Sequence, residues 1–306
     1  MKVSNLPPFP CVMGIINVTP DSFYAASRVQ EEDALRERVR QILDEGGTMI
    51  DVGACSTRPG AAEVSADEEL ARLRWAMPIV RQGADQWVAC HTATDDSDGG
   101  RTASPVLLSV DTYRAEVAEV CITQLGADVI NDVTGGVRDP RMLEVVAHTH
   151  AYYIMMHWID STDQLSEEDR MPDAGSVLQQ GSPIVERVIA FFKHQIEALK
   201  AISTEPEGCI CRLILDPGFG FGKTLEQNYE LMRSLGRLRK AFPDLPLLVG
   251  VSRKSMIHRL LRIAPEEALN GTTVLNTYAL MQGASILRVH DVKEAVEAVK
   301  ICGNLA

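Results

Sequence analysis

The sequence predicts a closed (β/α)8 TIM barrel, in which eight parallel strands alternate with helices. Two observations support this fold class. Short apolar runs recur along the chain, and each ends in a polar residue before a helix-like stretch begins. Continuous apolar runs are typical of strands buried on both faces, and their alternation with helices indicates a parallel sheet. Eight such units in 306 residues, with no linker between them, predict a single domain.

The expected strands lie near 11–18, 49–53, 106–111, 128–132, 152–157, 212–217, 247–252 and 285–290. The expected helices lie near 32–45, 66–82, 113–125, 140–148, 183–203, 225–242, 255–282 and 292–302, and Pro265 should divide the seventh. Capping-box spacing marks three helix starts, at Ser65 with Glu68, Thr224 with Gln227, and Asp291 with Glu294. Ser182 and Pro183 offer an N-cap followed by proline at the first helical position.

Two segments interrupt this alternation. Residues 88–105 precede the third strand, which predicts a solvated insertion at the bottom face of the barrel. Residues 159–181 follow the fifth strand and therefore form a loop at the mouth, which is either a lid or a mobile connection.

Composition excludes several classes of protein. The 30 basic and 42 acidic residues give a net charge of −12, which disfavours nucleic-acid binding. Seven cysteines form no C-x-x-C pair, and this suits a reducing cytoplasm. The first residues form no apolar signal segment, and no apolar run approaches the ~18 residues of a membrane span. We therefore expect a cytoplasmic protein without a membrane partner.

The polar strand ends predict an enzyme, because the C-terminal ends of barrel strands converge on one mouth where active sites lie. The glycine-rich segment at 218–224 fits neither nucleotide-binding loop. Pro217 stands where a P-loop needs its first glycine, and Lys223 replaces the third glycine of a dinucleotide loop.

Seven longer strings carry a more specific signal. They read MGIINVTPDSF at 13–23, STRPGA at 56–61, SVDT at 109–112, IND at 130–132, LDPGFGFGK at 215–223, SRKS at 252–255 and RVHD at 288–291. In this order and register the chain closely resembles the dihydropteroate synthase family from about residue 11 to residue 302. The resemblance implies a barrel that condenses 6-hydroxymethyl-7,8-dihydropterin pyrophosphate with 4-aminobenzoate, giving 7,8-dihydropteroate and pyrophosphate in folate biosynthesis.

The resemblance also implies the site residues. The pterin ring would be bound by Asp111, Asn131, Met156, Asp216, Lys254 and Arg288. The pyrophosphate would meet Asn17, Arg58, Arg288 and His290, with Mg²⁺ as cofactor and Asn17 as its protein ligand. The aminobenzoate would meet Phe23, Thr57, Arg58, Pro59, Phe221 and Ser252. Catalysis would fall to Asp21, Arg58, Asp111 and Lys254, of which the two aspartates could stabilise a cationic pterin methylene.

Two loops depart from the family pattern, and they keep alternatives open. Gly53-Ala54-Cys55 stands for the usual Gly-Gly-Glu, and Tyr24-Ala25-Ala26-Ser27 for Ser-Asp-Gly-Gly. One alternative is a catalytically silent pterin-binding paralogue. Another is a pterin-binding methyltransferase domain, which would not need Arg58, Arg288 and His290 around a pyrophosphate. The family also implies a homodimer, to which Val274, Leu275, Tyr278 and Met281 could contribute.

Overall fold

The protein was analysed as a computed structural model that describes residues 6–18, 28–55, 64–92, 105–159 and 183–305, without the side chains of 28–30. The strands are β1 (Cys11–Asn17), β2 (Met49–Gly53), β3 (Leu107–Asp111), β4 (Val129–Asp132), β5 (Tyr152–Met156), β6 (Leu213–Asp216), β7 (Leu248–Val249) and β8 (Ile286–Val289). The helices are α1 (Arg28–Asp44), α2 (Ala66–Thr92), α3 (Ala115–Gln124), α4 (Arg141–His148), α5 (Ile184–Ile202), α6 (Pro206–Ile210), α7 (Leu225–Arg233), α8 (Leu235–Ala241), α9 (Ser255–Leu261), η3 (Pro265–Glu267), α10 (Leu269–Met281) and α11 (Val292–Gly303).

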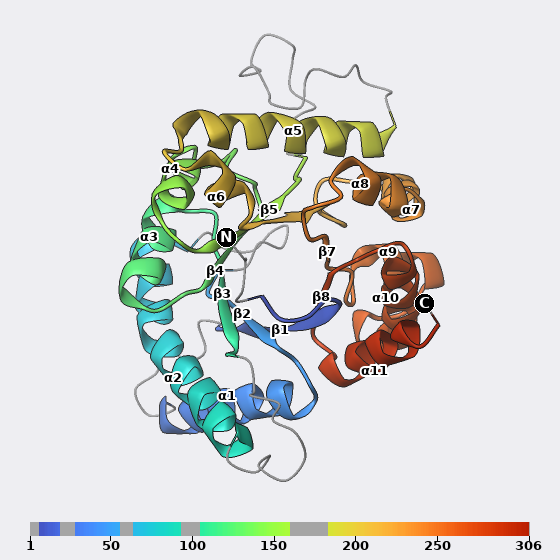
Figure 1. Cartoon of the computed structure of the whole chain (residues 1–306). Helices are drawn as coiled ribbons and strands as arrows, with labels where there is room; N and C mark the ends of the chain where they lie inside the picture. The colour runs from blue at the N-terminus through green and yellow to red at the C-terminus, as the bar shows by residue number, and fades with distance from the viewer. Residues whose placement is uncertain (1–5, 19–27, 56–63, 93–104, 160–182, 306) are drawn as a thin grey trace.

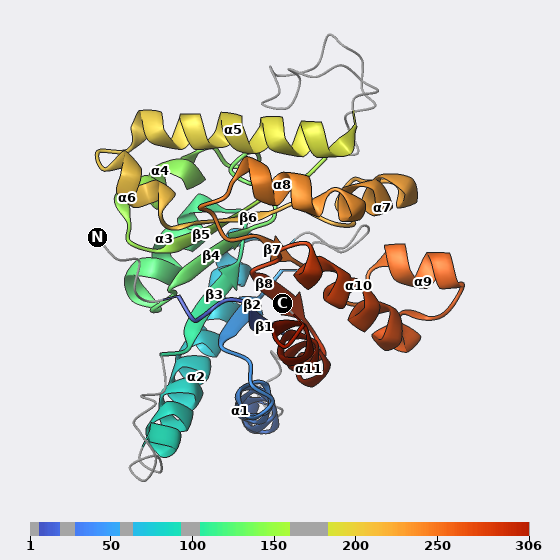
Figure 2. The ribbon, with the colours of Figure 1, turned by 45° about the vertical axis from the view of Figure 1, so that its right-hand side comes forward.

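The eight strands form one sheet in the order β6-β5-β4-β3-β2-β1-β8-β7, and the paired strands run parallel. Its two edge strands meet, because Leu215 forms a parallel bridge with Leu247 and its N–H donates to the carbonyl of Pro246 at 2.9 Å. Helices surround the strands as an outer layer (Figures 1 and 2). The predicted (β/α)8 barrel is confirmed.

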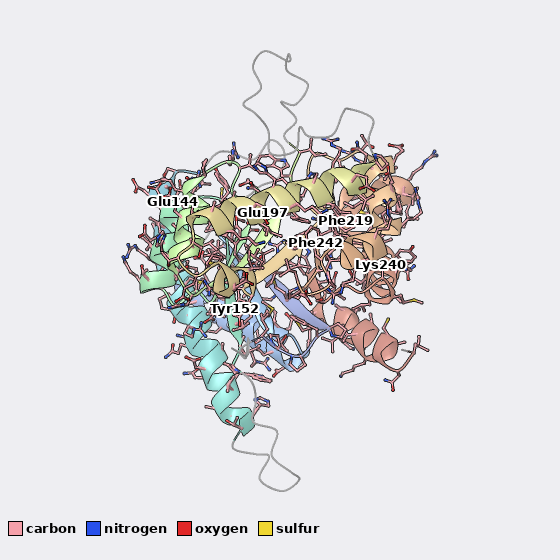
Figure 3. All side chains as sticks on the ribbon, turned by 45° about the horizontal axis from the view of Figure 1, so that its top comes forward. Glu144, Tyr152, Glu197, Phe219, Lys240 and Phe242 are labelled. Atoms are coloured by element: carbon pink, nitrogen blue, oxygen red, sulfur yellow. The ribbon has the colours of Figure 1, made fainter. Side chains whose placement is uncertain are left out.

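The barrel has two separate apolar cores. The larger one lies between the strands and the helices and includes Ile50, Val110 and Phe192. The smaller one fills the barrel interior with Cys11, Met13, Met49, Leu107, Val129, Tyr152, Ile154, Ile214, Leu248 and Ile286. Tyr152, labelled in Figure 3, begins β5 and so lies at the N-terminal end of the barrel. Apolar side chains therefore close the N-terminal end of the barrel interior. The polar side chains described below lie towards the C-terminal strand ends.

Helix α2 corrects the predicted boundary of the bottom-face insertion. It continues to Thr92, ten residues beyond the expected end at 82, so residues 88–92 are helical. The extension is stabilised because Trp87 and Val88 pack against the outer core and the Trp87 indole N–H donates to Asp44 at 2.8 Å. The rest of the predicted insertion, up to residue 104, and the mouth loop beyond Ile159 lie outside the described residues.

The structure tests the capping predicted at the helix starts. The Thr224–Gln227 capping box is complete, and Ser65 accepts from the Glu68 N–H at 3.2 Å. The box at Asp291 is wrong, because the carboxylate of Asp291 instead accepts from Arg253 Nε at 3.0 Å. Pro183 occupies the N-cap of α5 itself, not the first helical position predicted for it.

Two predicted helices are divided. Pro265 opens η3 between α9 and α10, as its fixed backbone angle predicts. The helix expected over 225–242 consists of α7 and α8 with a break at Ser234, which the sequence did not indicate. Within the described ranges, none of the helices is long and apolar enough to cross a bilayer.

Candidate functional site

Strand register places four predicted mouth positions side by side. Asn17 of β1 pairs with Gly53 of β2, Gly53 with Asp111 of β3, and Asp111 with Asn131 of β4. Register-matched residues of neighbouring parallel strands point to the same face of the sheet. The side chains of Asn17, Asp111 and Asn131 therefore share one level of the barrel mouth.

Arg288 of β8 connects this level to a carboxylate that the sequence analysis left without a role. Its Nη2 donates to Asp111 Oδ2 at 2.8 Å, and its Nε donates to Asp51 Oδ2 at 2.6 Å. The same Asp51 oxygen accepts from Asn131 Nδ2 at 3.0 Å. Asp51 is completely buried and stands two residues before Gly53, on the same face of β2. The two-residue alternation of side chains along a strand could have identified Asp51 from the sequence, because it places Asp51 on the same face as Gly53.

Burial and charge set the protonation of this cluster. Burial raises the pKa of Asp111 to about 7, against the lowering effect of Arg288, while the nearby Asp51 carboxylate raises it further. Burial alone would lower the pKa of Arg288, but Asp51 and Asp111 together raise it. Arg288 is therefore a permanent cation, and Asp111 can change its charge near neutral pH.

A second acid–base pair lies across the mouth on β6 and after β7. Asp216 pairs in register with Met156, and its Oδ1 accepts from the Gly218 N–H at 2.7 Å. Burial raises the pKa of Asp216, opposed first by Lys254. Burial lowers the pKa of Lys254 to about 8, opposed by Asp216. Each group thus helps to keep the other charged in a pocket that disfavours charge.

The Lys254 ammonium also contacts the glycine-rich segment after β6. It donates to the carbonyl of Phe219 at 2.7 Å and lies 4.5 Å from the centre of the Phe221 ring. Phe219, labelled in Figure 3, is itself fully buried. The aromatic ring predicted to contact aminobenzoate therefore stands beside the lysine predicted to contact the pterin.

The glycine-rich segment is a turn whose buried lysine, Lys223, donates to backbone carbonyls. Lys223 Nζ donates to the carbonyls of His157 at 3.0 Å, Gly218 at 2.8 Å and Phe221 at 3.3 Å. Gly218 has a φ of 71°, and a Cβ there would lie 1.9 Å from the His157 carbonyl oxygen. The structure agrees with the sequence in giving no phosphate-loop geometry at Lys223.

Ser252 and His290 were predicted for different ligands, and the fold brings them together. The Ser252 hydroxyl lies 3.0 Å from His290 Nδ1 and accepts from the His290 N–H at 3.2 Å. Arg38 Nη2 donates to the carbonyl of His290 at 2.7 Å and so anchors the end of β8 from α1. The predicted pyrophosphate and aminobenzoate positions are therefore neighbours at this side of the mouth.

Five predicted site residues, Asp21, Phe23, Thr57, Arg58 and Pro59, lie outside the described residues. The described stems of the 56–63 segment are both held by arginines. Arg72 Nη1 donates to the Ala54 carbonyl at 2.7 Å, and Arg114 Nη2 donates to the Val64 carbonyl at 2.6 Å. The backbone on both sides of this segment is thus tied to α2 and to the start of α3.

Gly53 lies between two side-chain oxygens at the mouth. A Cβ built there would lie 3.4 Å from Asn17 Oδ1 and 4.0 Å from Asp111 Oδ2. Amide and carboxylate oxygens are the donors that Mg²⁺ prefers, and Mg²⁺ usually keeps several waters beside few protein ligands. The described residues contain no cluster of three or more His, Cys, Asp or Glu that could hold a metal. The amide oxygen of Asn17 fits a sparsely ligated hard cation whose shell a substrate would complete.

The site as a whole combines a buried acid–base edge with a cationic region. Asp216, Asn131 and Lys254 offer acceptors and donors to a flat polar heterocycle. Arg288, with its donors already aligned, can contact an anion. A heterocycle carrying an anionic group fits this combination.

Comparison with known proteins identifies similar chains. Residues 13–95 and 99–290 match the family described as "Pterin binding enzyme". The dihydropteroate synthase of Escherichia coli K12 is 37% identical over 292 residues, which cover 95% of this chain and 90% of that protein.

Solved structures give the same result. A dihydropteroate synthase from Anaplasma phagocytophilum with bound 6-hydroxymethylpterin-monophosphate has a TM-score of 0.77 at 31% identity, covering 97% of this chain and 99% of the other. A dihydropteroate synthase from Xanthomonas albilineans with 4-aminobenzoic acid has a TM-score of 0.74 at 32% identity, covering 97% and 93%. The similarity therefore spans the whole barrel, including every strand end at the mouth.

Proposed function

Because this chain belongs to the dihydropteroate synthases of the pterin-binding enzyme family, we propose that its barrel mouth divides the substrates between two walls. The enzyme joins 6-hydroxymethyl-7,8-dihydropterin pyrophosphate to 4-aminobenzoate in folate synthesis. The pterin ring lies between Asp216, Lys254 and Asn131. The pyrophosphate and the aminobenzoate occupy the side formed by Arg288, Ser252 and His290.

The observation that carries this proposal is the pair of opposite charges Asp216 and Lys254, each of which favours the charged form of the other. Asp216 Oδ1 accepts from Gly218, and Oδ2 accepts no hydrogen bond from the described residues. That oxygen can accept from the ring amino group or a ring N–H, and Lys254 has two further N–H groups for a ring carbonyl or nitrogen. Unpaired buried polar groups cost ~1–3 kcal/mol each, so a ligand without this edge is disfavoured. Met156, buried beside Asp216, supplies apolar contact to the ring.

The leaving group is pyrophosphate, and negative charge grows on it as the bond to the pterin methylene breaks. Arg288 and His290 hold that charge on the β8 side, and Arg58 adds to it from the neighbouring loop. Asn17 and the space beside Gly53 would hold Mg²⁺, which supplies charge neutralisation on the phosphate oxygens. Asp111 and Asp21 stabilise the positive charge left on the methylene before the aromatic amine attacks.

The aminobenzoate ring lies against Phe221 and is completed by Phe23, Thr57, Arg58 and Pro59. Its carboxylate meets the Ser252 hydroxyl at the side where His290 stands. Lys254 lies beside the Phe221 ring and also faces the pterin edge, so only this one side chain stands between the two ligands. The amine of the aminobenzoate then faces the pterin methylene.

Release of pyrophosphate from the two substrates is the direct test of the proposed function. The purified protein should form 7,8-dihydropteroate and pyrophosphate in equal amounts, and omission of aminobenzoate should stop product formation. A protein that binds the pterin substrate but releases no pyrophosphate would instead be a silent paralogue, as the departures at Ala54, Cys55 and Tyr24–Ser27 leave open.

The metal requirement gives a prediction for Asn17. Turnover should depend on Mg²⁺, and Asn17→Ala should raise the Mg²⁺ concentration that gives half-maximal rate, because it removes an amide oxygen beside Gly53. Titration of Mg²⁺ at saturating substrates measures this. Turnover of the wild type at full rate in excess chelator would refute the metal assignment.

Aminobenzoate binding should depend on the first substrate. The ligand is small, and ordering the Phe23 and Thr57–Pro59 segments costs roughly 1–2 kcal/mol of backbone entropy per residue. Bound pyrophosphate and Mg²⁺ would offset this by recruiting Arg58 and Asp21. Calorimetry should detect aminobenzoate binding only with pterin and pyrophosphate present, and tight binding to the bare enzyme would contradict this order.

The same site should accept sulfonamides, because a 4-aminophenyl sulfonamide presents the ring, the amine and an acidic end. Inhibition is expected to be competitive with aminobenzoate and not with the pterin substrate, and Phe23→Ser should weaken it. Initial-rate kinetics with each substrate varied in turn provides the measurement. Inhibition that does not respond to aminobenzoate concentration would place the drug elsewhere.

We also propose a cytoplasmic homodimer. Val274, Tyr278 and Met281 follow one face of α10 and are 59%, 37% and 69% exposed, and Ile301 on α11 is 62% exposed. Leu275 lies half-buried beside this face. All seven cysteines are unpaired, as suits a reducing compartment. Sedimentation showing only a 33.6 kDa species at micromolar concentration would exclude the dimer.

A further inference from the structure

We infer that Asp51 is a positioning residue that holds Arg288 and Asn131 in the orientation needed for pterin pyrophosphate. This inference rests on the proposed assignment of those two residues to the pterin site. Asp51 itself is fully buried and lies one level below Gly53 in β2, with Ser109 at the matching position of β3. It therefore acts through its neighbours and not by contact with substrate.

One oxygen of Asp51 carries both connections. Oδ2 accepts from Arg288 Nε at 2.6 Å and from Asn131 Nδ2 at 3.0 Å, while Oδ1 is buried and has no hydrogen-bond partner among the described residues. The two donors come from β8 and β4, on opposite sides of β2 in the sheet order. A single carboxylate thus joins the cationic part of the mouth to the part that faces the pterin.

The bond to Asn131 decides which end of its amide faces the ligand. Because Nδ2 donates to Asp51, the amide oxygen is directed away from that carboxylate and can accept a hydrogen bond. Without Asp51, the amide could rotate and present its N–H₂ group instead. Asp51 therefore makes Asn131 an acceptor, which suits a ring edge that carries N–H groups.

The bond to Arg288 fixes the plane of its guanidinium. Nε is held by Asp51 and Nη2 by Asp111 at 2.8 Å, so two separate carboxylates constrain the group at two points. Arg288 Nη1 donates to no described residue and remains for the ligand. A guanidinium held at one point only would lose this alignment, and misplacement of ~1 Å can cost about 100-fold in rate.

Comparing Asp51→Asn with Asp51→Ala separates the effect of the two hydrogen bonds of Asp51 from the effect of its charge. Asn keeps an oxygen that can accept from both donors, so affinity for 6-hydroxymethylpterin monophosphate should stay within about threefold of wild type. Ala leaves both donors unpaired, and affinity should fall roughly 10- to 100-fold. The KM for aminobenzoate should change little in either variant. Ser109→Ala, at the matching position of β3 with a hydroxyl that has no partner among the described residues, is the control and should bind the probe like wild type.

A pH profile gives a second readout if Asp51→Ala does not fold. Arg288 from β8 lowers the pKa of Asp111, while Asp51 from β2, Glu69 from α2 and Asp132 from β4 raise it. Lys254, after β7, is a further cation that interacts with Asp111. Removing the charge of Asp51 while keeping Arg288 in place should lower the pKa of Asp111. The acidic limb of kcat/KM should therefore move to lower pH in Asp51→Asn.

Coupling completes the test. In an Asn131→Ala background, Asp51→Ala should cost less than in wild type, because part of its effect passes through Asn131. Full additivity, or folded Asp51→Ala with wild-type probe affinity, would overturn the inference, and so would an acidic limb of Asp51→Asn that stays in place or moves upward. Failure of the wild type itself to bind the probe would count against the proposed function instead.

Discussion

Asp111→Asn is expected to lower kcat by roughly 100- to 1,000-fold, which is the usual cost of removing one preorganised electrostatic group. In the proposed site the Asp111 carboxylate on β3 faces the pterin methylene, and it accepts a hydrogen bond from Arg288 at 2.8 Å. Asn keeps the size and one acceptor oxygen but cannot offset the cationic charge that develops as pyrophosphate leaves. Single-turnover rates at saturating substrates measure this loss without interference from product release.

The pH dependence checks the same assignment. Burial raises the pKa of Asp111 to about 7, and burial lowers the pKa of Lys254 to about 8. The active form needs Asp111 ionised and Lys254 protonated, so kcat/KM should fall below about pH 7 and above about pH 8. The residual activity of Asp111→Asn should lack the acidic limb. If Asp111→Asn kept the wild-type kcat, the stabilising charge would belong to another group. If it kept the acidic limb, another group would titrate there.

Asp216→Asn and Lys254→Ala are expected to impair pterin binding far more than folding. Each removes a group proposed to face the ring edge and leaves its charged partner in a buried pocket. The loss should be on the order of 1–3 kcal/mol, and more where the remaining charge stays unpaired. Calorimetry with 6-hydroxymethylpterin monophosphate measures the affinity, and circular dichroism confirms that each variant is folded.

Matched controls lie on α8 and just after it. Lys240→Ala removes an exposed lysine that Figure 3 places on the outside of the barrel, and Asp244→Asn changes an exposed carboxylate nearby. Both should bind the pterin probe like wild type. If folded Asp216→Asn and Lys254→Ala also bound it unchanged, the assignment of the pterin edge to this pair would be wrong.

Helix boundaries were less predictable than strands. The eight strands were found because burial on both faces requires mostly apolar residues, and such runs can be recognised from a short stretch of the sequence. The end of α2 did not match, because residues 83–92 are held as a helix by contacts of Trp87 and Val88 that are distant in sequence. The Asp291 cap failed for a similar reason, since Arg253, far away in the chain, takes its carboxylate.

The sequence by itself determined the fold class and the family, and it predicted the barrel mouth as the site together with the residues proposed for the two substrates. These follow from local periodicity and from polar residues at strand ends, which a parallel barrel gathers at one face. Only the tertiary structure decided how those side chains interact. In the folded chain Asp51 links Arg288 to Asn131. Lys223 donates to backbone carbonyls, and Ser252 lies within hydrogen-bond distance of His290. Such choices depend on strand register and burial, and these bring together residues that local sequence cannot relate.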